Sequence, residues 1–350
     1  MNPPADPTGV HPPGPGAVRR RATIRDVARA AGVNPSTVSR VLNGRAAFQV
    51  SDDVRRRVLE ASESLGYEPS RFARALRTRR SYMLALAVPN VADPFFSLMF
   101  QGAARAAERE GYTLVLTDQG GLERAARRTS DFDGLLIATA RRRDPLLTRL
   151  RSQGVAFVLV NRRSEEGAHP TVRSDDRAGS GLAVDHLVAL GHRRIAHLGG
   201  NEAYSTAYDR RQGYRAAMAW HGLEVDPRWL VEAGFTAEEG ARAADALLAL
   251  DPPHRPTAVV AVNDLAAVGL LTRARERGLK LPRDLSVTGF DDVPMARYVH
   301  PALTTVAVAA EEIGRVAVES LLDGARGGEV VLPVRLIPRA STAPPPGPAP

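Results

Sequence analysis

Ser36, Arg40 and Asn43 recur at intervals of four and three residues, which places their side chains on one face of an α-helix. All three side chains can hydrogen-bond. An arginine presented in this way can bind guanine O6 and N7 together in the major groove of DNA, and a phosphate contact is its alternative role. The stretch therefore predicts a DNA-reading face with Arg40 as the base contact.

The residues before that face predict two short helices with a tight turn between them. Thr23 and Asp26 are spaced for a capping box, and Gly32 suits the left-handed end of the first helix. Asn34 and Pro35 suit the N-cap and first position of the second helix. The pair indicates a helix-turn-helix, although an ordinary helical corner in a globular domain is the alternative.

The net charge of the chain is concentrated in the segment that contains these helices. Residues 1–81 hold 15 arginines and seven acidic residues, so the whole net charge of +8 belongs to them. Solvation of a charged surface does not predict such segregation, whereas attraction to phosphate does. The 350 residues suffice for two or three domains, and the absence of cysteine excludes disulfides and suits a reducing cytoplasm.

Motifs of other protein classes are missing from the sequence. No apolar run suits a signal peptide or a membrane span. Walker, HExxH and GxSxG motifs are absent, the GSGLAV stretch at Gly179 is too short for a dinucleotide fingerprint, and the eight histidines are not spaced for a metal. We therefore expect a cytoplasmic protein without membrane contact, cofactor or enzymatic activity.

From Met83 onward, apolar runs of strand length alternate with amphipathic helical stretches. This βαβα order predicts parallel sheets with helices on both faces, arranged as two α/β lobes. A ligand is then expected in the crevice at the carboxyl ends of the strands. The Pro/Gly-rich residues 1–18 and the terminal residues 343–350 are expected to be disordered tails.

Several patterns in a fixed order resemble the DNA-binding headpiece and hinge of the LacI/GalR family of bacterial transcription regulators. They are DVARAAGV (26–33), STVSRVLN (36–43), GYEP (66–69) and ARAL (73–76). The resemblance implies an all-α headpiece at 19–66, a hinge helix at 67–80, and a periplasmic-binding-protein-like domain for effector binding and dimerisation at 81–342. It also implies lobe crossings near Ser174, after Thr305 and near Pro338. The loop at 44–51 is longer than the family pattern, and the segment at 118–134 is shorter, so its helix should be stunted.

The same resemblance implies which residues contact DNA. Leu76 matches a hinge leucine that wedges into the minor groove, although simple burial is its alternative. The full set of expected DNA contacts is Thr23, Pro35, Ser36, Thr37, Arg40, Asn43, Arg71, Ala73 and Leu76.

Ligand contacts are also implied, at positions where strands end. Arg210, expected to begin a helix, would join Asn263 and Asp291 in clamping vicinal hydroxyls, whereas Asp264 is expected to be a plain helix cap. Aromatic rings would stack on a sugar. For Phe95 and Phe96, packing in the core is the alternative. The full set is Phe95, Phe96, Asn161, Arg162, Arg210, Phe235, Asn263 and Asp291.

Together these features predict a ligand-responsive, sequence-specific DNA-binding regulator, a repressor that binds a palindromic operator in double-stranded DNA as a homodimer. A small sugar is the expected effector, with a purine as the alternative. A different class of protein, a cytoplasmic sugar-binding or sugar-modifying protein whose N-terminal helices serve another role, is the second hypothesis.

Overall fold

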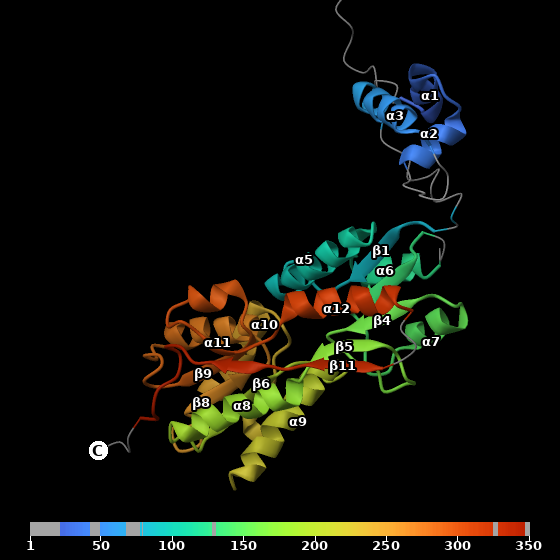
Figure 1. Cartoon of the computed structure of the whole chain (residues 1–350). Helices are drawn as coiled ribbons and strands as arrows, with labels where there is room; N and C mark the ends of the chain where they lie inside the picture. Colours follow the sequence, from blue (N-terminus) through green and yellow to red (C-terminus); the bar gives the residue numbers. More distant parts are fainter. Residues whose placement is uncertain are drawn as a thin grey trace, which may run out of the picture. The chain divides into compact units, whose positions relative to one another are not determined.

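A computed structural model describes residues 22–42, 50–67, 78, 80–127, 131–324 and 328–346. The chain divides into two compact units, residues 1–80 and 81–350. Figure 1 shows a helical unit at the N-terminal end of the sequence and a larger unit of strands and helices. Most of the predicted hinge helix at 67–80 lies outside the described residues.

The smaller unit contains three helices, α1 (Ile24–Ala31), α2 (Pro35–Leu42) and α3 (Asp52–Ser64). Its predicted helix signals are confirmed. Thr23 N–H and hydroxyl both donate to Asp26 Oδ2, at 2.9 and 2.7 Å. Gly32 adopts the left-handed conformation at φ 65°, which glycine enters without steric strain. One valine from each helix, Val27, Val38 and Val58, is wholly buried, so the three helices share one small core.

The first lobe of the larger unit is built on a six-stranded, entirely parallel sheet in the order β11-β5-β4-β3-β1-β2. Its strands are β1 (Met83–Ala87), β2 (Thr113–Thr117), β3 (Gly134–Ile137), β4 (Phe157–Val160), β5 (Thr171–Ser174) and β11 (Glu329–Leu332). Its helices are α5 (Pro94–Arg109), α6 (Gln119–Ala125), α7 (Pro145–Ser152) and α12 (Ala310–Leu322). As expected, α6 is short.

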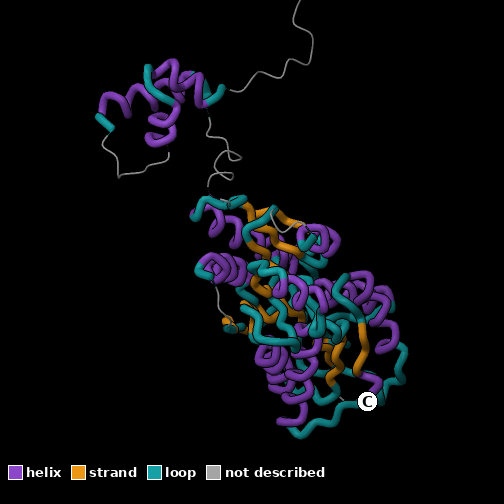
Figure 2. Tube along the Cα trace, turned by 90° about the vertical axis from the view of Figure 1, so that its right-hand side faces the viewer, coloured by secondary structure: helices purple, strands orange, loops and turns teal. Residues whose placement is uncertain are grey.

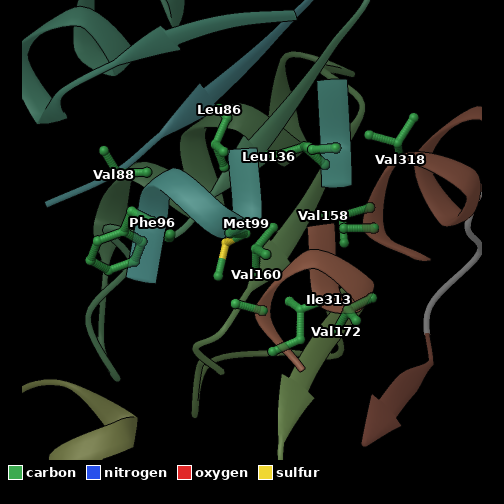
Figure 3. Packing of buried hydrophobic residues seen from close by; sticks show 14 of the residues in the cluster. Leu86, Val88, Phe96, Met99, Leu136, Val158, Val160, Val172, Ile313 and Val318 are labelled. Atoms are coloured by element: carbon green, nitrogen blue, oxygen red, sulfur yellow. The ribbon is translucent and has the colours of Figure 1, made fainter. Parts of the chain in front are cut away.

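Alternate residues of these strands contribute side chains to two hydrophobic cores, one on each face of the sheet. Helices α5 and α12 lie side by side over one face (Figure 1), and Figure 3 shows Leu86, Leu136 and Val158 packed beneath them. Helices α6 and α7 cover the other face. Close approach of α5 and α12 requires glycine, because a Cβ on Gly102 would lie 1.9 Å from the Glu311 carbonyl oxygen.

The second lobe repeats this architecture with the strand order β12-β10-β9-β8-β6-β7, in which only β12 is antiparallel to its neighbour. The strands are β6 (Ile195–Gly199), β7 (Leu230–Glu232), β8 (Ala258–Ala261), β9 (Ser286–Asp291), β10 (Thr304–Ala307) and β12 (Arg335–Ile337). The helices are α8 (Asp176–Ala189), α9 (Ser205–Trp220), α10 (Ala237–Leu248) and α11 (Asp264–Glu276), with the 3₁₀ turns η1 (Pro227–Trp229) and η2 (Pro294–Arg297). Helices α8 and α9 contribute to one core and α10 and α11 to another. Figure 2 shows helices flanking the strands of the larger unit.

The chain passes between the lobes three times. The crossings after β5, at Ser174, and after β10, beyond Thr305, agree with the sequence-based expectation. The third was expected near Pro338 and lies earlier, between Leu332 at the end of β11 and Arg335 at the start of β12. The expectation was wrong because Arg335–Ile337 pairs with β10 and is therefore already part of the second sheet.

Candidate functional site

The outward face of α2 carries the residues expected to read DNA. Pro35, Ser36 and Arg40 are exposed, and Thr37 is half-buried. Thr23 is exposed at the start of α1, where its hydroxyl is bonded to Asp26. The remaining expected DNA contacts, Asn43, Arg71, Ala73 and Leu76, lie outside the described residues.

In the larger unit, Arg210 is the centre of a buried ionic cluster in the second lobe. Its Nε donates to Asp176 Oδ1 at 2.7 Å and its Nη2 donates to Asp291 Oδ1 at 3.3 Å. Its Nη1 donates to the Val262 carbonyl at 2.5 Å, and the guanidinium lies over the Phe290 ring. These contacts hold Arg210 rigidly at the carboxyl ends of β8 and β9.

The expectation that Arg210 begins a helix was wrong. Helix α9 starts at Ser205, so Arg210 lies in its second turn. The Asn201 side chain accepts from Ala203 N–H at 2.8 Å, which turns the chain early enough for the following polar residues to become helical. The shift aims Arg210 inward towards β8 and β9.

Burial determines the electrostatics of this cluster. It raises the pKa of Asp291 well above 3.8 and raises that of Asp176, while the positive charge of Arg210 opposes both shifts. Asp291 also has a left-handed backbone at φ 109°, which aspartate and asparagine tolerate better than most residues. A carboxylate held in this way is suited to accept hydrogen bonds from hydroxyl groups.

Asn263 has the helix-cap role that was expected of Asp264. Asn263 is the N-cap of α11, since its Oδ1 accepts from Ala266 N–H at 2.9 Å, and its Nδ2 donates to the Phe235 carbonyl at 2.9 Å. Asp264 is not the cap. Its carboxylate accepts from Val293 N–H at 2.9 Å and from the Thr305 hydroxyl at 2.5 Å. Asp264 thereby ties α11 to η2 and to the strand that leads back to the first lobe.

Replacing Asp264 with asparagine should change how the stability of the larger unit depends on pH. Burial raises the pKa of Asp264 to about 7 in the folded chain, from an ordinary value of 3.8. The folded chain therefore retains a proton that the unfolded chain releases, and the stability due to this proton is lost as pH rises towards 7. Asparagine does not titrate and can still accept from Val293.

Thermal unfolding of both proteins between about pH 4 and pH 8 tests this expectation. The Tm of Asp264→Asn, relative to that of the wild type, should increase with pH and level off above about pH 7. Asp245→Asn, at a surface ion pair, is the matched control. A Tm difference independent of pH would contradict the shifted titration.

Asn161 and Arg162 follow β4, and Arg162 contacts the second lobe. Asn161 has a left-handed backbone at φ 63°, and Arg162 is buried, with its guanidinium 3.9 Å from the centroid of the Tyr204 ring. The same guanidinium is 5.9 Å from the centroid of Phe235. Two expected ligand contacts from different lobes, Arg162 and Phe235, are thus brought together.

A cavity of about 690 Å³ opens beside Tyr204 at the carboxyl ends of β1, β2 and β3, a volume typical of small-ligand sites. Tyr204 is its only lining residue from the second lobe among the described residues. The first lobe supplies Pro89, Gln119, Glu123, Arg127, Thr139, Arg141, Arg143, Asp144, Pro145, Leu146 and Arg149.

Phe95 and Phe96 are placed differently from the other expected ligand contacts. They are 2% and 6% exposed and belong to the core of the first lobe, where Figure 3 shows Phe96 beside Met99. Their rings pack edge to face. Here they occupy the core-packing role that the sequence left open as the alternative.

Polar contacts clasp the two lobes together. Arg163, after β4, donates through Nε and Nη2 to the carboxylate of Asp209 on α9, both at 2.9 Å. Arg163 N–H donates to Ser205 Oγ at 2.9 Å, and Arg142 N–H donates to the Ala203 carbonyl at 2.8 Å. The lobes are therefore joined at the start of α9, next to Tyr204.

Sequence reasoning missed several members of this site. The expected site residues did not include Asp176, Tyr204, Arg163 or Asp209. The position of Asp176, two residues after the strand at the first lobe crossing, was a usable signal. The pairing of Arg163 with Asp209, 46 residues apart, had no local signal in the sequence.

Within the described ranges, no helix is long and apolar enough to cross a membrane. The same residues contain no group of three or more His, Cys, Asp or Glu side chains placed to hold a metal ion.

Comparison with known proteins matches both units. Residues 23–70 match the family described as "Bacterial regulatory proteins, lacI family", and residues 184–342 match the "Periplasmic binding protein-like domain". The chain is 34% identical over 332 residues to the HTH-type transcriptional repressor CytR of Escherichia coli K12, covering 92% of this chain and 96% of that relative.

Two solved structures are similar over almost the whole chain. The lac repressor dimer bound to operator and the anti-inducer ONPF has a TM-score of 0.81 at 28% identity, covering 93% of this chain and 100% of that chain. The complex of the transcriptional regulator CelR with cellobiose has a TM-score of 0.70 at 32% identity, covering 92% and 100%.

Proposed function

Because the chain belongs to the LacI family of bacterial transcription regulators and is a ligand-responsive repressor, we propose that its smaller unit binds DNA and its larger unit binds the effector. The headpiece, as one half of a homodimer, reads one half of a palindromic operator through α2. The larger unit binds a small sugar between its lobes. The relatives do not favour the alternative of a sugar-binding or sugar-modifying protein.

The exposed polar face of α2 is the observation that carries the DNA-reading proposal. Its arginine projects from a helix whose other face is buried in the headpiece core, as a recognition helix requires. Arg40 would bind a guanine, and Ser36 with Pro35 and Thr37 would adjust the sequence preference. Thr23, Asn43 and Arg71 are proposed phosphate or backbone contacts, and Ala73 with Leu76 are proposed minor-groove contacts.

The sugar proposal rests on the mixture of hydrogen-bonding groups where the strands end. Arg210 only donates, a carboxylate such as Asp291 only accepts, and the amide of Asn161 does both. A sugar hydroxyl is donor and acceptor at once, so it suits this mixture. The complex of the similar regulator CelR with cellobiose supports a sugar over a purine.

Effector binding would act on DNA affinity through the lobes. The contacts of Arg163 with α9 and of Arg142 with the segment before α9 hold the lobes together, and a ligand that prefers this arrangement over a more open one shifts the balance between them. The change in operator affinity is limited by that preference. We further propose that the protein is not an enzyme and acts in the cytoplasm, where its operators are.

Arg40→Ala tests the DNA-reading proposal. The variant should lose about 1–3 kcal/mol of operator binding free energy per half-site, because two hydrogen bonds to one base are removed. It should also discriminate less against substitutions at one symmetric position of the operator. Gel-shift titrations against a set of singly substituted palindromes measure both effects.

Arg56→Ala removes the same charge from α3 and serves as the control. Its operator affinity should fall less, and equally for all operator sequences. If Arg40→Ala also weakens binding equally on every sequence, Arg40 contacts phosphate and the base-reading role is refuted.

A further inference from the structure

Several buried polar atoms without hydrogen-bond partners gather at one edge of the first sheet. They are Gln119 Oε1, Thr139 Oγ1, Asn161 Oδ1, and Arg162 Nε and Nη1. These residues follow β2, β3 and β4, whose carboxyl ends lie at the same edge because the strands are parallel. Buried polar groups normally have partners, so such a cluster marks a place where a ligand supplies them.

Arg162 needs a partner more than the other residues of this cluster do, because it is a buried cation. It is 3% exposed, and no carboxylate of a described residue forms a salt bridge with it. Burial lowers the pKa of Arg162 to about 10, so the side chain remains charged at neutral pH. Arg210, equally buried, has two carboxylate partners, so Arg162 differs from it in lacking a carboxylate partner among the described residues.

The cavity of about 690 Å³ beside Tyr204 also carries an excess of positive charge. The Tyr204 ring, which Arg162 faces at 3.9 Å, lines the cavity. Four arginines line it as well, namely Arg127, Arg141, Arg143 and Arg149, against the two acids Glu123 and Asp144. Glu123 lies 3.9 Å from Arg127, and Asp144 accepts from the backbone N–H groups of Arg141 and Leu146. The positive charge therefore exceeds the negative charge on this wall.

We propose, resting on the sugar-binding function above, that the effector is an anionic sugar whose phosphate ester or carboxylate is bound beside Arg162. Arg162 Nε and Nη1 then gain charge-assisted hydrogen bonds, and the buried cation gains its counter-ion. Sugar hydroxyls face the carboxylates of Asp176 and Asp291 at the other end. The proposed site therefore binds the anionic group in the first lobe and the hydroxyl groups in the second.

The test uses the full chain and sets of probes that differ only in the anionic group: glucose, glucose 6-phosphate and glucuronate; ribose and ribose 5-phosphate; and inorganic phosphate alone. Thermal shift and calorimetry measure binding, and operator gel shifts measure the response. Inorganic phosphate should raise the Tm of the wild type. In the set that matches the site, an anionic member should bind at least about tenfold more tightly than its neutral parent. The anionic probe that binds more tightly shows whether the site prefers a phosphate or a carboxylate group.

Arg162→Met removes the cation and keeps an apolar chain to pack on Tyr204. Without ligand its Tm should equal or exceed that of the wild type, because a buried charge without a partner is removed. The variant should also lose the Tm increase with phosphate and the preference for the anionic probe. Arg277→Met, at a surface ion pair, should retain both. A lower Tm of Arg162→Met without ligand would make Arg162 a structural cation and overturn the inference.

The two proposals fail in different ways. If neutral sugars raise the Tm and change operator affinity while phosphate and the anionic sugars do not, the anionic assignment is overturned and the sugar-responsive function stands. If no probe changes either the Tm or operator affinity, the sugar assignment falls and the anionic inference falls with it.

Discussion

Replacing Arg210 with alanine should destabilise the larger unit by about 3–5 kcal/mol, the cost of breaking a buried ionic network from one side. The substitution leaves the carboxylates of Asp176 and Asp291 buried near each other without a cation, and the Val262 carbonyl without its donor. Urea denaturation of the full chain, followed by a signal from the larger unit, measures the change.

The pH dependence of this loss identifies its cause. Burial already raises the pKa of both carboxyl groups, and removal of the positive charge raises them further. Protonation neutralises the stranded acids, so the deficit of Arg210→Ala relative to the wild type should shrink as pH falls. Arg277→Ala, at a surface ion pair, should cost less than about 1 kcal/mol. A deficit that stays constant with pH would argue that lost packing on Phe290 is responsible.

Asp291→Asn should abolish the effector response while operator affinity in the absence of effector stays close to that of the wild type. Asparagine retains the shape, tolerates the backbone at φ 109° and can still accept from Arg210. It loses the charged acceptor, and a hydrogen bond to a charged group contributes about 1.5–3 kcal/mol. Calorimetry with the sugar identified by the probe set should therefore show a loss of roughly tenfold or more in affinity.

Operator titrations with and without that sugar provide the second measurement. Asp245→Asn, remote from the site and part of a surface ion pair, should respond like the wild type. Equal sugar affinities of wild type and Asp291→Asn would remove Asp291 from the site. Weaker operator binding by Asp291→Asn without sugar would show that it acts on the balance between the lobes instead.

The headpiece helices could be predicted from the sequence alone, because their signals are local. The capping box of Thr23 with Asp26, the turn at Gly32 and the start of α2 at Pro35 each involve residues within a few positions of one another. Alternation of apolar runs with helical stretches likewise predicted two parallel sheets, since the pattern of each strand and helix can be recognised within a short stretch of sequence. The positions where strands end drew attention to Asn263 and Asp291, and the family resemblance added Arg210, before their contacts were known.

The contacts of those polar residues could not be predicted from the sequence. Asn263 and Asp264 are adjacent and both suit a helix start. Hydrogen bonds from the distant Thr305 and Val293 give Asp264 its different role, which is to tie α11 to η2 and β10. The charge of Arg210 is balanced by Asp176, 34 residues away, whereas Arg162 has no such partner among the described residues. These partners are far apart in sequence and come together only in the folded lobe. Helix caps and strand patterns depend on near neighbours, but the charge balance of a buried site depends on that long-range packing.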